Sequence, residues 1–180
     1  MASFLFFAAV SADGYLAGPD GDMAWAEKYL EGGEDYGFAD LMNRSVAVLE
    51  GSKTFDFELN ALGDQARMLP TFVLTSNPMK YDGLTDPNVH FVSGPIAQVV
   101  AEINRKIQGQ VFVVGGADVV RQLMQVGLLD QLTLFISPDV LGGGVPLFET
   151  SLEEALSGFE IASTKDFESG LSQRDYRVVR

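Results

Sequence analysis

The sequence predicts an α/β protein built on a mixed, mainly parallel sheet. Short apolar runs that are typical of buried strands alternate with helical segments through the middle of the chain, which favours parallel strands connected by helices. The chain ends in two extended segments, 159–167 and 171–179, on either side of Ser169 and Gly170. This pattern is typical of a hairpin, so we expect the sheet to end in an antiparallel edge.

The first half of the chain contains three predicted strands. Segments 3–10, 46–50 and 71–75 are apolar runs, and glycine or the turn signal Ser76-Asn77-Pro78 follows the last two. Between the first two strands, 11–22 holds three glycines and a proline, which predicts a mobile loop. We expect a helix over 34–44 and a short one around 55–59.

The second half continues the alternation. Segment 89–92 is a predicted strand, and 96–107 has apolar residues at helical spacing behind Pro95, a residue suited to an early helical position. Segment 111–114 is a β-branched apolar run typical of a strand buried on both faces. A predicted helix follows it, and 132–137 is a further strand. We expect one domain over 1–180.

Composition limits the classes of partner. The chain has 180 residues, of which 47% are hydrophobic and 21% charged, as in a soluble globular protein. Twelve basic and twenty-five acidic residues give a net charge of −13, and such a surface repels nucleic acid and anionic membranes. We therefore expect a small-molecule ligand, with no nucleic acid and no membrane as partner.

Cysteine and histidine usage argues against a metal centre. The chain has no cysteine and a single histidine, His90, so neither a thiolate zinc site nor a two-histidine motif can form. His90 lies in an apolar strand and is interpreted as structural. The apolar segment 4–10 lacks the positive flank of a signal peptide, and no run approaches the ~18 apolar residues of a spanning helix. We expect a cytoplasmic protein.

The stretch from Gln110 to Met124 is the strongest local signal for a ligand. Its apolar strand passes through Gly115 and Gly116 directly into a helix. Glycine allows a ligand to approach the backbone, and the free N–H groups of the first helical turn favour an anion such as a phosphate. The alternative is a plain strand-to-helix turn with no ligand.

Small and hydroxyl-bearing residues follow two further predicted strands. Gly51-Ser52-Lys53-Thr54 and Thr75-Ser76-Asn77 also follow apolar runs, and ligands of open α/β sheets bind beyond the carboxyl ends of the strands. Together, the three ends favour a long phosphorylated ligand over three unrelated turns. The formal nucleotide motifs are absent, because no glycines fall as G-x-G-x-x-G and the phosphate-loop order is missing.

Several side chains in the first third of the chain are candidates for substrate chemistry. Carboxylates are frequent in or near the first loop and helix, and one of them is a candidate general acid, although solvated surface charges are the alternative. Trp25 and Phe38 are candidates to line a ring-binding pocket, with core packing as the alternative.

Taken in order, the motifs resemble the dihydrofolate reductase-like superfamily, and most closely the branch containing the reductase domain of the bacterial riboflavin-biosynthesis deaminase-reductase. The matching stretches cover nearly the whole chain: VSADGYLA at 10–17, Trp25, LEGSKTF at 49–55, VLTS at 73–76, VFVVGGAD at 111–118, ISPDVLGGGVPLF at 136–148, and the terminal segment from Ser169 to Tyr176.

The resemblance implies a dihydrofolate reductase-like α/β domain of about eight strands that binds NADPH across the strand ends. It implies that Ala9 and Leu16 face the nicotinamide. The remaining cofactor positions that it implies are Gly51, Ser52, Lys53, Thr54, Thr75 and Ser76 for the adenosine side, and Val114, Gly115, Gly116, Ala117, Asp118 and Val119 for the pyrophosphate.

The resemblance also implies a catalytic acid and reveals two departures. Asp35 stands about where dihydrofolate reductase keeps its acidic substrate residue, 16 positions before Gly51. Members of the family usually carry arginine where Ser52 and Asn77 stand, and these arginines would grip the 2′-phosphate of NADPH. Lys53 is the residue that we expect to compensate.

We therefore expect an NADPH-dependent oxidoreductase that transfers hydride to a pterin- or pyrimidine-like small molecule, with no metal. The alternative is a non-catalytic nucleotide-binding or regulatory protein on the same fold. We also expect a homodimer, because relatives are often dimeric and leucines are dense near the late strands, at Leu128, Leu129, Leu132 and Leu134. The alternative is that these leucines belong to the core.

Overall fold

A computed structural model describes residues 1–63 and 67–179 of the chain. The chain forms two compact units. Unit 1 comprises Met1–Leu5 and Asp40–Leu129, and unit 2 comprises Phe6–Ala39 and Asp130–Arg180. Strand β1 (Ala2–Val10) begins in unit 1 and continues into unit 2. The expected single-domain organisation stays a prediction.

The predicted mixed, mainly parallel sheet of about eight strands is confirmed. Hydrogen bonding gives an eight-stranded sheet with the order β5-β4-β3-β6-β1-β7-β10-β9, and β2 (Tyr15–Ala17) pairs separately with β8 (Val145–Pro146). The predicted antiparallel edge is also present, because β9 (Phe159–Asp166) pairs antiparallel with β10 (Ser172–Val178).

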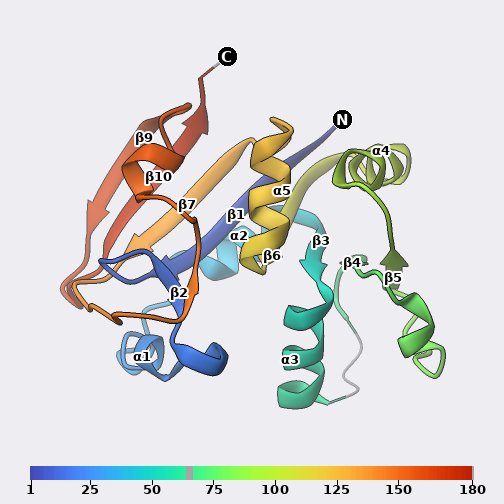
Figure 1. Cartoon of the computed structure of the whole chain (residues 1–180), viewed down its shortest axis with the longest axis horizontal. Coiled ribbons are helices and arrows are strands. Elements are labelled where there is room, and N and C mark those ends of the chain that lie inside the picture. Colours follow the sequence, from blue (N-terminus) through green and yellow to red (C-terminus); the bar gives the residue numbers. More distant parts are fainter. Residues whose placement is uncertain (64–66, 180) are drawn as a thin grey trace. The chain divides into compact units, whose positions relative to one another are not determined.

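Unit 1 holds the parallel strands. In it, β3 (Ser45–Gly51) pairs in parallel with both β4 (Thr71–Leu74) and β6 (Gly109–Gly115), and β4 pairs in parallel with β5 (Val89–Val92). Its α-helices lying wholly within the unit are α3 (Ser52–Leu62), α4 (Ile96–Lys106) and α5 (Ala117–Gln125). Figure 1 shows α3 leaving the end of β3, and α5 packs against β6 and β3.

The core of unit 1 explains why these segments fold as predicted. The apolar stripe of α4 at Ile96, Val99, Val100 and Ile103 is buried, and so are Val119, Val120 and Leu123 of α5. Burying such stripes removes apolar surface from water and holds both helices on the sheet. A 3-10 turn (η2, Pro78–Tyr81) follows β4 where the sequence predicts a turn.

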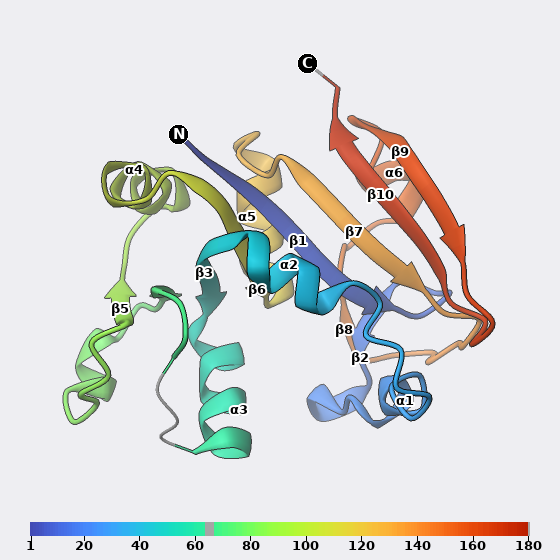
Figure 2. The same ribbon diagram turned by 180° about the vertical axis from the view of Figure 1, so that it is seen from behind.

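Unit 2 holds the antiparallel strands and the first loop. Strand β10 pairs antiparallel with β7 (Gln131–Ile136), as the neighbouring ribbons in Figure 2 show. The short elements of this unit are η1 (Pro19–Gly21), α1 (Ala24–Glu27) and α6 (Leu152–Ala155). Contrary to the expected loop over 11–22, this segment contains β2, because Tyr15 and Ala17 pair with the strand that follows the triple glycine.

Two helix boundaries differ from the prediction for local reasons. Helix α2 (Phe38–Arg44) begins four residues later than the expected 34–44, because Tyr36 and Gly37 have φ values of 53° and 84°. Helix α3 begins at Ser52 and is longer than the expected 55–59, since the extended Gly51 leads into it directly. Among the described residues the longest helices, α3 and α4, have 11 residues each, and none is long and apolar enough to cross a membrane.

Candidate functional site

Two helices of unit 1 begin at a glycine that follows a parallel strand. Gly51 precedes α3 with φ −86° and ψ 155°, and Gly116 precedes α5 with φ −71° and ψ −169°. Within the described residues, neither cap position supplies a side chain that bonds the first helical turn. In α5 the N–H of Val119 already donates to the carbonyl oxygen of Gly116 at 3.0 Å, so the N–H groups that remain for a ligand are those at the very start of each helix, where the helix dipole favours a negative charge.

The two glycine turns lie against each other. A Cβ added to Gly51 would lie 3.2 Å from Cγ2 of Val119 and 3.7 Å from the backbone N of Gly116. A Cβ added to Gly116 would lie 3.5 Å from Oγ1 of Thr54. The Gly115–Gly116 peptide bond is cis. The structure thus brings two uncapped helix starts and one hydroxyl together, which is the donor set that a diphosphate requires.

The third predicted strand end lies beside them. Leu74 pairs with Gly51 in the register of β3 and β4, so Thr75 and Ser76 follow the sheet at the same edge. Thr75 is buried, and its Oγ1 accepts a hydrogen bond of 3.1 Å from the backbone N of Asn77. Ser76 is exposed. Three neighbouring parallel strands therefore end in the side chains that the sequence singles out.

The other predicted cofactor positions of unit 1 differ in exposure. Ser52 and Val114 are half-buried, and Ala117 and Val119 are buried. The carboxylate of Asp118 forms an ion pair with Arg121, so it partly neutralises the positive charge of Arg121 near the start of α5. Lys53 is exposed on the first turn of α3, and within residues 1–63 and 67–179 it forms no ion pair.

Unit 2 contributes an aromatic cluster. Its buried members are Tyr29, Tyr36, Phe135 and Leu171, and Phe7, Ala9, Trp25 and Phe167 pack against them. The rings of Phe7 and Phe135 are 4.8 Å apart, edge to face. The indole Nε1 of Trp25 is buried and has no hydrogen-bond partner in the described part of the chain. A buried donor without a partner is costly, so this nitrogen is a candidate to bond a ligand.

Phe38 and Leu16 occupy different places in unit 2. Phe38 is 46% exposed, and its ring centroid lies 6.3 Å from that of Phe7 at the margin of the aromatic cluster. Leu16 lies in β2, is half-buried, and is not a member of the cluster. The structure therefore brings Ala9, Trp25 and Phe38 to one aromatic cluster and leaves Leu16 outside it.

Asp35 is exposed and already engaged. Its Oδ1 accepts a hydrogen bond of 2.9 Å from the N–H of Gly37, and its Oδ2 accepts one of 3.1 Å from the N–H of Ala39. These two bonds lower the pKa of the Asp35 carboxyl. A general acid needs a raised pKa, so this geometry favours a helix-start role. The catalytic role of Asp35 stays a prediction.

The carboxylate of Asp13 likewise accepts hydrogen bonds from backbone N–H groups. Its carboxylate accepts hydrogen bonds from Oγ of Ser11 at 2.7 Å and from the N–H groups of Leu141 and Gly142 at 3.1 and 2.8 Å. The bond from Ser11 is the main reason that the pKa of Asp13 is lowered. The residue ties the first loop to the segment that leads into β8.

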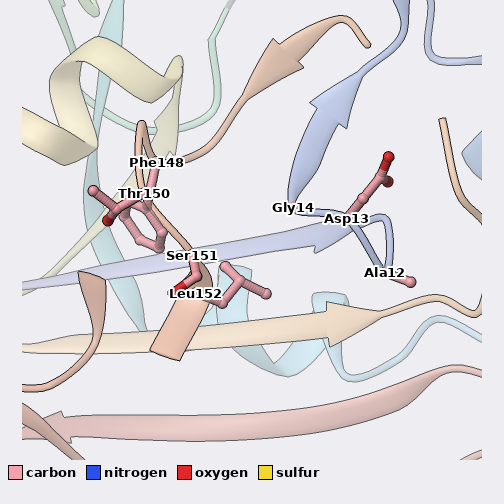
Figure 3. Close-up of a pocket in the computed structure, with 7 residues that line it drawn as sticks. All are labelled: Ala12, Asp13, Gly14, Phe148, Thr150, Ser151 and Leu152. Atoms are coloured by element: carbon pink, nitrogen blue, oxygen red, sulfur yellow. The ribbon is translucent and has the colours of Figure 1, made fainter. Parts of the chain in front are cut away.

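A cavity of about 200 Å³ lies beside this loop, between 12–14 and 148–152. Figure 3 shows the Asp13 carboxylate directed away from Ser151 and Leu152. The residues that line it include no cation, and their one carboxylate, that of Asp13, is bonded to backbone N–H groups. The cavity therefore presents no charged group that could bind or protonate a substrate.

One residue that the sequence reasoning missed is Glu50, the last side chain of β3 before Gly51. It is 0% exposed, and within the described residues neither of its carboxyl oxygens has a hydrogen-bond partner. Burial, together with the charge of Glu58, raises the pKa of Glu50 to about 8, and Arg67 opposes the shift. The available signal was a single acidic residue within the apolar run from Val46 to Gly51.

Several solved structures share this fold, and one of them is a complex with NADP(H). A putative riboflavin biosynthesis protein from Shewanella sp. PV-4 superposes with a TM-score of 0.81 at 28% identity and covers 99% of both chains. A Thermotoga maritima deaminase and 5-amino-6-(5-phosphoribosylamino)uracil reductase gives 0.73 at 16% identity, over 98% of this chain and 56% of its own. Dihydrofolate reductase from Enterococcus faecalis, complexed with NADP(H) and RAB-propyl, gives a TM-score of 0.67 at 17% identity and covers 99% of this chain and 97% of its own. The last two show the fold.

Sequence relatives extend over most of the chain. YwjB of Bacillus subtilis (strain 168) is 27% identical over 168 residues, which is 91% of each protein, and YyaP of the same organism is 28% identical over 178 residues. The family model of the RibD C-terminal domain matches residues 3–171. This match confirms the resemblance to the riboflavin-biosynthesis reductase branch: the chain belongs to the RibD C-terminal domain family.

Proposed function

We propose that the protein is an NADPH-dependent reductase that transfers hydride to a ring imine or carbonyl of a pterin- or pyrimidine-like molecule. The observation that carries the proposal is the pair of glycine turns, Gly51 and Gly116, which face each other at the carboxyl ends of β3 and β6. Support also comes from family membership and from the NADP(H) complex of the dihydrofolate reductase with the same fold.

The residues of unit 1 fit the phosphates of such a cofactor. The N–H groups at the starts of α3 and α5 would bond the pyrophosphate, and the absence of a Cβ at Gly51 and Gly116 lets the two turns that carry them pack closely together. Lys53 would supply the positive charge that distinguishes NADPH from NADH, in place of the arginines absent at Ser52 and Asn77. Once bound, the nicotinamide supplies the hydride.

The aromatic cluster of unit 2 fits a planar ring. Phe7, Trp25 and Phe38 present partly exposed aromatic surface, and the buried indole N–H of Trp25 would bond a carbonyl or ring nitrogen of the substrate. The protein then orients the ring and excludes water from it. The chemical step also needs a proton on the ring nitrogen as the hydride arrives on carbon.

The proposal is tested by titrating NADPH against wild-type protein and Gly116→Ala, following nucleotide fluorescence. The variant adds a methyl group that the protein itself accommodates, 3.5 Å from Oγ1 of Thr54, but that a diphosphate would meet. Gly83→Ala is the matched control, because nothing lies within 4 Å of its Cβ. We expect at least tenfold weaker binding in Gly116→Ala alone. Equal affinity in all three folded proteins would refute the site.

Binding and turnover are then separated. Oxidation of bound NADPH by any of a panel of oxidised pterins and aminopyrimidines supports the reductase. Tight binding with no substrate-dependent oxidation across the panel favours the non-catalytic alternative instead.

A further inference from the structure

Glu50 shares a sheet face with an aromatic cluster of unit 1. Paired residues of parallel strands point to the same face, and the register pairs Glu50 with Val73 and Val73 with Phe91. Phe55 of α3 and Tyr81 of η2 pack against Val73, and Phe91 packs beside them. The carboxyl group of Glu50 is therefore buried on the face that this cluster covers, and in the described residues its two oxygens have no hydrogen-bond partner.

Two charged side chains act on Glu50. Glu58, on α3, raises the pKa of Glu50, and Arg67, beyond the end of α3, lowers it. Arg67 forms an ion pair with Glu58, and their side chains are 20% and 24% exposed. The cation that favours an ionised Glu50 is thus already neutralised by a second carboxylate, so it compensates only weakly for the burial of a charge.

Other titratable groups of the elements packed here are engaged or lie elsewhere. The hydroxyl of Tyr81 donates a hydrogen bond of 2.9 Å to Oδ1 of Asp56, whose Oδ2 is bonded to Nζ of Lys80 at 2.5 Å. His90 pairs with Phe72 of β4, and their rings lie 5.2 Å apart on the opposite face of the sheet. Ionisation of Glu50 would therefore create a poorly compensated charge inside unit 1, which is costly.

The proposed anion site begins one residue after Glu50. Gly51 follows it and precedes α3, and in the register of β3 and β6 Glu50 lies opposite Gly115, next to the Gly116 that precedes α5. A Cβ on Gly51 would meet Val119, so α5 packs on the face opposite to that of Glu50. A pyrophosphate at the two helix starts and an ionised Glu50 would be negative charges within a few residues of each other. They would repel strongly, because little water lies between them to screen the charges.

Binding of the anion and protonation of Glu50 then depend on each other. A neutral Glu50 leaves the positive ends of both helix dipoles free to act on the phosphates, whereas an ionised Glu50 opposes them. By linkage, bound nucleotide favours the proton on Glu50 as strongly as that proton favours nucleotide. The pKa of Glu50 is raised to about 8, so affinity should be highest below this pH and fall as the pH rises above it.

We propose that Glu50 couples nucleotide binding to a proton: the paired glycine turns accept the pyrophosphate of NADPH while Glu50 is neutral and lose affinity for it when Glu50 is ionised. The proposal rests on the proposed cofactor site and adds its regulation by pH. Glu50 acts on binding through its charge and without touching the ligand. The Glu58–Arg67 pair sets the pH at which affinity changes.

The test is NADPH titration of the full chain by nucleotide fluorescence from about pH 6.5 to about pH 9.5. We expect the affinity of the wild-type protein to fall by about fivefold or more over this range, and that of Glu50→Gln to change by less than about twofold. Glu160→Gln, an exposed carboxyl-to-amide change on β9 of unit 2, is the matched control and should follow wild type. Titration of other groups affects all three proteins alike, so the difference between the profiles isolates Glu50.

Two further measurements leave Glu50 in place and apply even if Glu50→Gln does not fold. Glu58→Gln removes the charge that raises the pKa of Glu50 and frees Arg67, so the fall in affinity should begin at a lower pH than in wild type. Isothermal titration of wild type, in two buffers of different ionisation enthalpy, should show proton uptake on NADPH binding above about pH 8 and less uptake near pH 6.5.

A wild-type affinity that stays level across the pH range overturns the proposal. So do parallel profiles for wild type and Glu50→Gln, an unshifted profile for Glu58→Gln, or alkaline binding without proton uptake. In each of these cases NADPH still binds, so only the coupling fails. If wild-type protein binds no NADPH at any pH, the proposed reductase fails and the coupling fails with it.

Discussion

Glu50 lies opposite Gly115 in the parallel pairing of β3 and β6, one residue before the glycine that starts α3. An acidic side chain is thus buried beside a turn whose free N–H groups attract anions. The two features have opposite charge preferences, and they coexist because Glu50 keeps its proton: its pKa is about 8.

Glu50 should make the free energy of unfolding depend on pH. Its pKa is about 8 in the folded protein and 4.5 in an unfolded chain, so the folded state binds more protons between these values. The stabilising contribution is complete below pH 4.5, and it is lost as the pH rises to 8, by up to ~1.4 kcal/mol per pH unit. Urea denaturation of wild type and Glu50→Gln at several pH values measures it. Glu50→Gln should gain on wild type as the pH rises, and parallel profiles would contradict the burial argument.

Gly144 should be indispensable to the pairing of β2 with β8. Its φ is +134°, and a Cβ there would overlap the carbonyl oxygen of Ala17 and the backbone of Gly18. Gly144→Ala should therefore destabilise the protein by more than ~2 kcal/mol, as a strained and overpacked position does. Gly143→Ala, whose Cβ meets nothing within 4 Å, is the control and should change little. Similar urea midpoints for the two variants would argue against this contact.

Lys53 should set the cofactor preference. A charged contact with phosphate of ~1.5–3 kcal/mol corresponds to roughly ten- to a hundredfold in affinity. Lys53→Ala should erase most of the preference for NADPH over NADH and leave NADH affinity nearly unchanged. Lys165→Ala, in β9 of unit 2, is the control. An unaltered NADPH/NADH affinity ratio would assign the 2′-phosphate to another residue.

The homodimer stays a prediction, and the buried leucines near the late strands do not support it. Leu129, Leu132 and Leu134 are buried inside the protein, so they cannot line a surface between subunits. Strand β9 is the better candidate, because it ends the sheet, is exposed along most of its length, and carries Ile161 at its surface. An unpaired edge can pair with a second copy. Light scattering should give about twice 19.5 kDa for wild type and a lower mass for Ile161→Lys; a mass near 19.5 kDa for wild type would exclude the dimer.

Hydrophobic periodicity predicted most of the fold. The strand from Val89 to Val92 was located without error, and the helix after Pro95 ended within a residue of its predicted limit, because both depend on burial of a local apolar pattern. The short β2 strand was not predicted, because its residues pair with a segment about 130 positions later and carry no local pattern of their own. The late start of α2 follows from the left-handed Tyr36, which a propensity argument does not foresee.

The sequence likewise predicted only part of the candidate site. The glycine turns could be predicted, because a strand followed by glycine and then a helix is visible in sequence, and the structure brings Gly51 and Gly116 together. The pKa and the hydrogen bonds of each carboxyl group could not be predicted, because they depend on which residues pack around it in the fold. Asp35 is attractive by its spacing from Gly51 but is exposed and bonded, whereas Glu50 is marked only by being acidic in an apolar run.

The measurement that tests the central claim most directly is a crystal structure of the protein with bound NADPH. The account predicts that the pyrophosphate lies at the paired glycine turns, with its oxygens bonded to first-turn N–H groups of α3 and α5 and with the 2′-phosphate near Lys53. A nucleotide bound away from Gly51 and Gly116, or a structure that remains without nucleotide at saturating NADPH, would contradict it.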